Sequence, residues 1–139
     1  MKVMIDTNII LDVLYKREDF YEDSLNIFRL CETKTIIGYV STLSIANIIY
    51  IMRKDLSKEK INELLTWMSI IFKIVDLKSD DLVNAADFNI KDYEDALQYA
   101  QAKRIKANFI VTRNIKDYLN ISNKNTEVIL PKNLFEKLI

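Results

Sequence analysis

The chain alternates between short apolar runs and longer segments in which apolar residues recur three or four positions apart. The short runs are rich in β-branched residues and predict strands, whereas the longer periodic segments predict helices. The predicted strands are residues 2–5, 36–40, 73–77, 109–112 and 128–130. The first predicted helix follows the first strand directly, and the last begins near Pro131. Between them we predict helices over about residues 19–32, from Ser41 or Thr42 through Met52, and over residues 57–71, 79–88 and 92–105. Strands that alternate with helices predict an α/β fold: a three-layer α/β/α sandwich around a central parallel sheet of about five strands.

Polar residues at the starts of the apolar periodic segments support these helices. Thr7 or Asn8 can cap the first helix, with Asp6 as the alternative cap. Ser41 and Thr42 can cap the helix that ends at Met52, and Ser57 and Asp92 stand before two others. Pro131 is suited to the first turn of the closing helix, because proline lacks an N–H and an N–H in the first turn has no hydrogen-bond partner within the helix.

Length and composition favour one domain over residues 1–139. Half of the 139 residues are hydrophobic, which is enough for a sizeable core. The single glycine, Gly38, and the single proline exclude a flexible linker and a glycine-rich phosphate-binding loop.

The ionisable residues limit the chemistry further. Twenty basic residues balance twenty acidic ones, so the charge balance argues neither for nor against a nucleic-acid partner. The chain has no histidine, which excludes Ser-His and Cys-His nucleophiles and histidine-bound zinc, and its one cysteine, Cys31, fits an apolar core pattern. With no apolar run long enough for a signal peptide or a membrane span, we expect a cytoplasmic protein that has no contact with a membrane.

Acidic and amide residues gather at three places. Asp6 follows the first strand, Asp92 and Asp95 open a helix three positions apart, and Asn114 and Asp117 follow the fourth strand. Each group also has an ordinary structural explanation, since Asp and Asn are preferred helix caps and turn residues.

Taken together, the three groups indicate a site. The carboxyl ends of parallel strands meet at one edge of a sheet, where ligands of open α/β folds bind. Carboxylates gathered there repel one another unless a proton, a basic group or a hard cation is present. Because oxygen ligands suit hard cations, Mg²⁺ or Mn²⁺ is the expected occupant.

At these residues the sequence resembles the PIN domain family, and in particular the small prokaryotic ribonuclease toxins of VapBC-type toxin–antitoxin pairs. The resemblance covers essentially the whole chain and rests on the segments 5–8 (Ile-Asp-Thr-Asn), 95–100 (Asp-Ala-Leu, then Ala100) and 111–118 (Val-Thr-Arg-Asn, then Asp-Tyr). It implies a divalent-metal-dependent endoribonuclease that hydrolyses RNA phosphodiester bonds, with an antitoxin protein as partner and a homodimer as the common assembly. The implied catalytic residues are Asp6, Asp95 and Asp117, and the implied metal ligands are these three together with Asn114.

The chain departs from the family pattern at two positions. Asn47 stands where the family usually has glutamate, and Asn114 stands where many members have aspartate; an amide oxygen can bind a cation but adds no negative charge. We therefore expect weaker metal binding than four carboxylates would give. The residues expected to support the site are Asn8, Asn47, Asp92 and Thr112, and those expected to contact RNA phosphates are Arg53, Arg113 and Lys116.

Two alternatives stay open at this point. The two asparagines keep open a catalytically weakened PIN-like module that binds RNA or a protein without cutting. A receiver-like signalling domain that is phosphorylated at Asp6 is less well supported, because the segment Thr112 to Asn114 offers no lysine at the strand end.

Overall fold

The computed structural model describes residues 1–118, 121 and 125–138. All strand pairs are parallel, and the strands form one five-stranded sheet in the order β3-β2-β1-β4-β5. The strands are β1 (Lys2–Ile5), β2 (Ile37–Ser41), β3 (Lys73–Val75), β4 (Phe109–Val111) and β5 (Glu127–Ile129). The helices are α1 (Thr7–Leu14), α2 (Tyr21–Glu32), α3 (Thr42–Met52), α4 (Lys58–Ile71), α5 (Ser79–Ala86), α6 (Tyr93–Arg104), the 3-10 helix η1 (Ile115–Tyr118) and α7 (Pro131–Leu138). The predicted fold class is confirmed.

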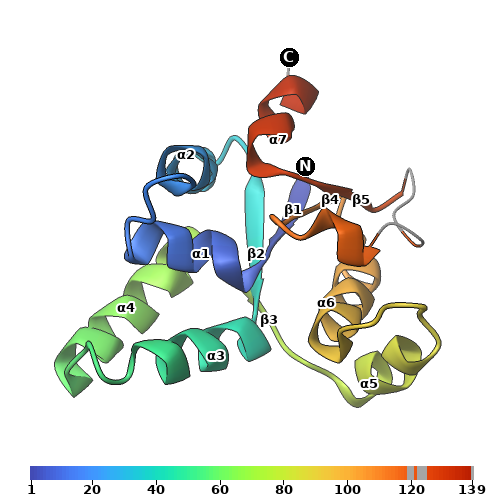
Figure 1. Ribbon diagram of the computed structural model, residues 1–139, viewed down its shortest axis with the longest axis horizontal. Coiled ribbons are helices and arrows are strands. Elements are labelled where there is room, and N and C mark those ends of the chain that lie inside the picture. The colour runs from blue at the N-terminus through green and yellow to red at the C-terminus, as the bar shows by residue number, and fades with distance from the viewer. Residues whose placement is uncertain (119–120, 122–124, 139) are drawn as a thin grey trace.

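The central strand β1 contributes side chains to both faces of the sheet. Val3 and Ile5 belong to the core under α1 to α4 and α7, whereas Met4 belongs to the core under α6. Helices α1 to α4 lie on one side of the sheet and α5 and α6 on the other (Figure 1), and α5 packs mainly on α6. Both faces are therefore covered, which explains why residues 3–5 of β1 form a continuous apolar run.

Helix caps agree with the sequence pattern except at the first helix. Ser41, Ser57 and Asp92 each accept a backbone N–H in the first turn of their helices, as predicted. Of the alternatives for α1, Thr7 and Asn8 are wrong and Asp6 is the cap, because its backbone is still extended (φ −70°, ψ 151°) and its carboxylate accepts the N–H of Thr7. Helix α1 thus starts directly at the end of β1.

Other differences lie at the ends of elements. Strand β2 is shifted by one residue from its predicted range, β5 begins one residue earlier, and β3 and α5 each end two residues earlier than predicted. Helix α2 begins at Tyr21 instead of position 19, because the preceding residues form a tight turn in which the N–H groups of Phe20 and Tyr21 donate to the carbonyl of Arg17. The predicted polar segment 113–124 contains η1, and its residues 119–120 and 122–124 lie outside the described residues.

Close packing between α2 and β2 explains the single glycine. Cys31 is buried in the core, as predicted, and a Cβ at Gly38 would lie 2.5 Å from its Sγ atom. A side chain at position 38 would therefore push α2 away from the sheet.

The position of β1 between β2 and β4 determines where the candidate residues meet. Ile5 pairs with Val111, so Asp6 and Thr112 leave neighbouring strands side by side at the carboxyl edge of the sheet. Among the described residues, the longest apolar helical segments are too short or too polar to cross a membrane.

Candidate active site

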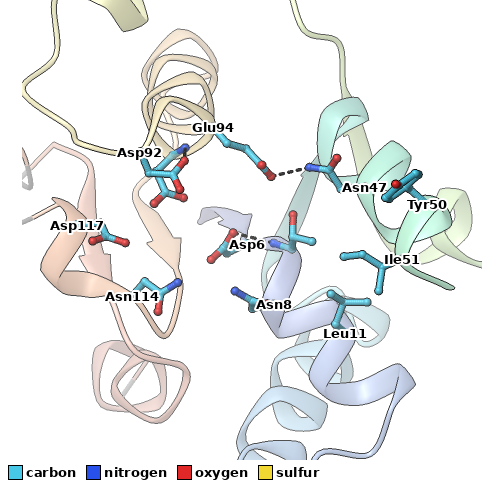
Figure 2. A pocket seen from close by; sticks show the side chains of 12 residues that line it. Asp6, Asn8, Leu11, Asn47, Tyr50, Ile51, Asp92, Glu94, Asn114 and Asp117 are labelled. Carbon is cyan, nitrogen blue, oxygen red and sulfur yellow. Dashed lines mark hydrogen bonds between the residues drawn. The ribbon is translucent and has the colours of Figure 1, made fainter.

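A crevice of about 380 Å³ opens at this edge of the sheet. It is lined by Asp6, Thr7, Asn8, Leu11, Asn47, Tyr50, Ile51, Asp92, Glu94, Asp95, Asn114 and Asp117. Figure 2 shows carboxylate and amide groups around most of the crevice, with Leu11, Tyr50 and Ile51 together on one side. Since a water molecule takes up roughly 30 Å³ in the liquid, the space is sufficient for a hydrated cation and a phosphate group.

Asp6 both caps α1 and faces the crevice. Its Oδ1 atom accepts the backbone N–H of Thr7 at 2.8 Å and the Nε2 of Gln98 at 3.2 Å, and its Oδ2 atom accepts the hydroxyl of Thr112 at 2.7 Å. Burial raises the pKa of Asp6, although these hydrogen bonds oppose the rise. The structural and the functional explanations of Asp6 are thus compatible, because one carboxylate has several lone pairs.

Asp95 lies in the first turn of α6 and lines the same crevice. Burial, the negative charges of Asp6 and Asp92 and, to a smaller extent, that of Asp117 raise the pKa of Asp95 to about 7, against a lowering hydrogen bond from Tyr118. Burial is the largest cause, and the rest of the rise is the repulsion expected when carboxylates are brought together. A divalent cation between them would remove that repulsion.

The segment after β4 brings in the third group. The N–H of Asn114 donates to the hydroxyl of Thr112 at 3.0 Å, and the N–H of Asp117 donates to the carbonyl of Asn114 at 3.1 Å. These bonds turn the chain so that both side chains line the crevice (Figure 2). The structure therefore brings together all four residues predicted as metal ligands.

The predicted supporting residues occupy two kinds of position. Asn8, Asn47 and Asp92 line the crevice, and the carboxylate of Asp92 also accepts the N–H of Asp95 at 3.2 Å. Thr112 is completely buried and reaches the site through its hydrogen bond to Asp6.

Glu94 is a crevice residue that the sequence pattern did not single out. Its Oε1 atom accepts the Nδ2 of Asn47 at 2.6 Å, which joins α6 to α3 across the crevice (Figure 2). Burial and the charges of Asp92 and Asp6 raise the pKa of Glu94, although the Asn47 hydrogen bond lowers it. The sequence feature that could have identified Glu94 was its place between two acids in one helical turn. Helical spacing, however, puts Asp92 and Asp95 side by side and places Glu94 on another face of the helix.

Gln98 and Tyr118 were also missed as site residues. Gln98 lies one turn after Asp95, among alanine and leucine residues that predict a core face, and it contacts Asp6. The one sequence feature that could have identified Gln98 as a site residue was a polar side chain within that apolar pattern. Tyr118 is completely buried, and burial together with the charges of Asp6 and Asp95 raises its pKa further above the ordinary value.

The donor set fits a hard cation. Carboxylate and amide oxygens are ligands of Mg²⁺ and Mn²⁺, and the crowding that raises the pKa of Asp95 is the kind that a cation relieves. In the part of the chain that the structure describes, no three acidic side chains are already arranged to hold an ion directly. Ligation through water fits this spacing, since Mg²⁺ usually keeps several of its waters.

The three residues predicted to contact RNA differ in their surroundings. The guanidinium of Arg53 lies 3.8 Å from the ring centre of Tyr50, at the wall of the crevice, and Lys116 is exposed on η1. Arg113 instead forms a two-bond ion pair with the buried carboxylate of Asp12, at 2.8 and 3.0 Å, and lies 3.9 Å from the ring centre of Phe20. This placement indicates that Arg113 stabilises the fold through Asp12, whereas contact with RNA stays a prediction.

Comparison with known proteins agrees with this geometry. Residues 2–116 match the PIN domain family, and no functionally curated protein matches the chain. A chain of VapBC2 from Rickettsia felis bound to a DNA fragment from their promoter is similar at 24% identity, with a TM-score of 0.69, over 94% of this chain and 98% of that one.

Two further solved structures share the fold. A chain of a toxin–antitoxin complex from Klebsiella pneumoniae is 19% identical, with a TM-score of 0.66, over 93% of this chain and 97% of that one. A chain of VapBC-1 from nontypeable Haemophilus influenzae is 14% identical, with a TM-score of 0.68, over 95% and 99%. The family match spans β1 to η1 and so includes the residues of the crevice from Asp6 to Asn114, and we conclude that this chain belongs to the PIN domain family.

Proposed function

We propose that the protein is a divalent-metal-dependent endoribonuclease and the toxin of a toxin–antitoxin pair. The observation that carries the proposal is the meeting of Asp6, Asp95 and Asp117 at one crevice, although they come from three segments of the chain. The PIN family match supports nuclease chemistry, and the three similar structures, all from toxin–antitoxin complexes, support the biological setting.

In this proposal Asp6, Asp95, Asn114 and Asp117 hold Mg²⁺ or Mn²⁺, directly or through water. When bound, the ion lowers the pKa of a water molecule and neutralises charge on the phosphate. Thr112 and Gln98 keep the Asp6 carboxylate oriented through their hydrogen bonds at 2.7 and 3.2 Å. Asn8, Asn47 and Asp92 line the same crevice and support the site by orienting these groups and their waters.

RNA is the proposed substrate, and its phosphates need positive partners near the acids. Arg53 is well placed, because it stacks on Tyr50, a residue that lines the crevice and is 65% exposed. Exposed aromatic rings stack on unpaired bases, so Tyr50 is suited to hold a single-stranded segment. Lys116 and the outer edge of Arg113 would contact phosphates from the opposite side.

The partners and setting follow from the same proposal. An antitoxin protein would cover the acidic crevice, and a basic side chain there would replace the cation electrostatically. We also propose that residues 1–139 act as a single domain, that the protein forms a homodimer as is common in the family, and that it acts in the cytoplasm, where its RNA substrates are.

The first test is cleavage of a pool of structured RNAs by the purified protein with Mn²⁺, with Mg²⁺ and with a chelator. We expect cutting only with metal, and a loss of at least about 100-fold in Asp95→Asn, because the mutation removes a charge that holds the ion. Circular dichroism and thermal unfolding of the variant control for folding. Cleavage that persists in chelator, or that the variant retains, would overturn the proposal.

A second candidate function, a PIN module that binds RNA without cutting it, is favoured by one contact. The residue that replaces the usual glutamate, Asn47, donates its amide to Glu94 and brings no charge of its own to the crevice. The same experiment separates the two functions: RNA binding without cleavage in either metal would support the binding module.

A further inference from the structure

We propose that Gln98 and Tyr118 are positioning residues of the crevice, joined in a buried polar connection that fixes the carboxylate of Asp6. The inference rests on the proposed function, because it assigns these two residues to the metal site of that function. Neither residue lines the crevice, so Gln98 acts through the Asp6 carboxylate that it contacts, and Tyr118 acts through Gln98.

Gln98 forms the first half of the connection. Its Nε2 donates to Oδ1 of Asp6 and to the hydroxyl of Tyr118, both at 3.2 Å. The side chain is buried, with 4% of the residue exposed, so water does not compete for these bonds. A carboxylate and a hydroxyl that both accept from one amide nitrogen also fix which way the amide is turned.

Tyr118 forms the second half. Its hydroxyl oxygen accepts the Nε2 of Gln98 at 3.2 Å, so it holds the amide that contacts Asp6. The residue is completely buried against Tyr99, with ring centres 6.4 Å apart, so packing fixes the position of the hydroxyl. A rigid neutral acceptor thereby keeps the Gln98 amide directed at Asp6.

The fold places two like charges close together, and the hydrogen bond from Gln98 holds one of them, Asp6, in position. Asp6 lies at the end of β1 and Asp95 in the first turn of α6, and like charges on different elements tend to separate or to turn toward water. Neutral hydrogen-bond partners on the buried side oppose such a movement of Asp6. Outer hydrogen-bond partners of this kind are worth about 10- to 100-fold in metal affinity.

The test compares two tyrosine variants of the full chain by Mn²⁺ titration followed by electron paramagnetic resonance. Tyr118→Phe removes only the hydroxyl that accepts from Gln98. Tyr99→Phe is the matched control, because it removes another hydroxyl of the same core, which donates to the carbonyl of Ile121 at 2.7 Å. Thermal unfolding without metal shows that both variants are folded at the titration temperature.

We expect Mn²⁺ affinity to fall about 10-fold in Tyr118→Phe and to stay within about twofold of the parent in Tyr99→Phe. Gln98→Met is the second variant, used also if Tyr118→Phe does not fold, and we expect a loss of similar size. Because the two residues act through one connection, the double variant should bind no more weakly than about the poorer single variant. Equal affinities in Tyr118→Phe and Tyr99→Phe, or strictly additive losses, would overturn the inference.

The outcomes also separate this inference from the proposed function. If the parent protein binds no Mn²⁺, the metal-dependent nuclease and the inference both fail. If the parent binds Mn²⁺ and Tyr118→Phe binds it equally well, only the inference fails. If the variant loses affinity but the parent cuts no RNA, the positioning role stands and the nuclease assignment fails.

Discussion

At the scale of single residues, the departure at position 47 is the most informative feature of the site. Asn47 lines the crevice, and its amide donates to Glu94 at 2.6 Å. The sequence resemblance implies that the family usually has a glutamate at this position. The carboxylate in this part of the crevice therefore comes from Glu94 on α6. Helix α3, on the other side, contributes the uncharged amide of Asn47.

Asn47→Glu tests what this position contributes. The substitution places a second carboxylate beside Glu94, and we expect Mn²⁺ to bind several-fold more tightly because one more negative ligand faces the ion. The metal-free variant should be less stable than the parent, since two carboxylates then face each other. Asn47→Gln is the uncharged control for side-chain size. Titration calorimetry of both variants measures the difference, and equal affinities would place residue 47 outside the metal site.

At the scale of secondary-structure elements, a buried acid joins the segment after β4 to α1 and α2. Asp12 is completely buried on α1, and its carboxylate accepts hydrogen bonds from Arg17, Ser24 and Arg113. Arg113 stands between Thr112 and Asn114, so this ion pair holds the segment that carries two residues of the crevice.

Asp12→Asn should therefore lower the free energy of unfolding by about 3 kcal/mol, because breaking one partner of a buried ion pair leaves the others unpaired. Denaturant unfolding measures this change. Arg17→Ala is the comparison, since the Arg17 side chain is 35% exposed and its loss should cost about 1 kcal/mol or less. A loss in Asp12→Asn no larger than in Arg17→Ala would mean that the ion pair does not hold the segment.

At the scale of the whole molecule, the fold raises the pKa values of three of the acids that it gathers. The pKa of Asp95 rises to about 7, and those of Asp6 and Glu94 are raised as well, in each case mainly by burial. In the unfolded chain these groups have pKa values of about 4. Between about pH 4 and pH 7 the folded state thus binds more protons than the unfolded state.

We therefore expect the metal-free protein to lose stability as the pH rises from about 4 to about 7, because stability falls with pH wherever the folded state binds more protons. Mn²⁺ binding should tighten over the upper part of this range, as protons leave Asp95. Thermal unfolding at a series of pH values, with Asp95→Asn as the comparison, measures both effects with and without metal. A stability that rises toward pH 7 to the same extent in both proteins would contradict the raised pKa of Asp95.

Much of this architecture could be predicted from the sequence. The alternation of strands and helices, the caps at Ser41, Ser57 and Asp92, and the position of Asp6 at a strand end are local patterns, because backbone geometry repeats every two or 3.6 residues. Such patterns also indicated that Asp6, Asp95, Asn114 and Asp117 would lie at one edge of the sheet. The sequence left the cap of α1 open, since Asp6, Thr7 and Asn8 are all good caps and only the backbone angles distinguish them.

The sequence by itself thus determined the class of fold, the chemistry of the acids and the edge at which they meet. Tertiary structure alone decided which side chains touch. It joined Glu94 to Asn47, Arg113 to Asp12, and Gln98 to both Asp6 and Tyr118. In each case the partners are 20 to 101 positions apart in the chain. Local periodicity carries no information about such distant pairs, because their contacts depend on how whole elements pack against the sheet.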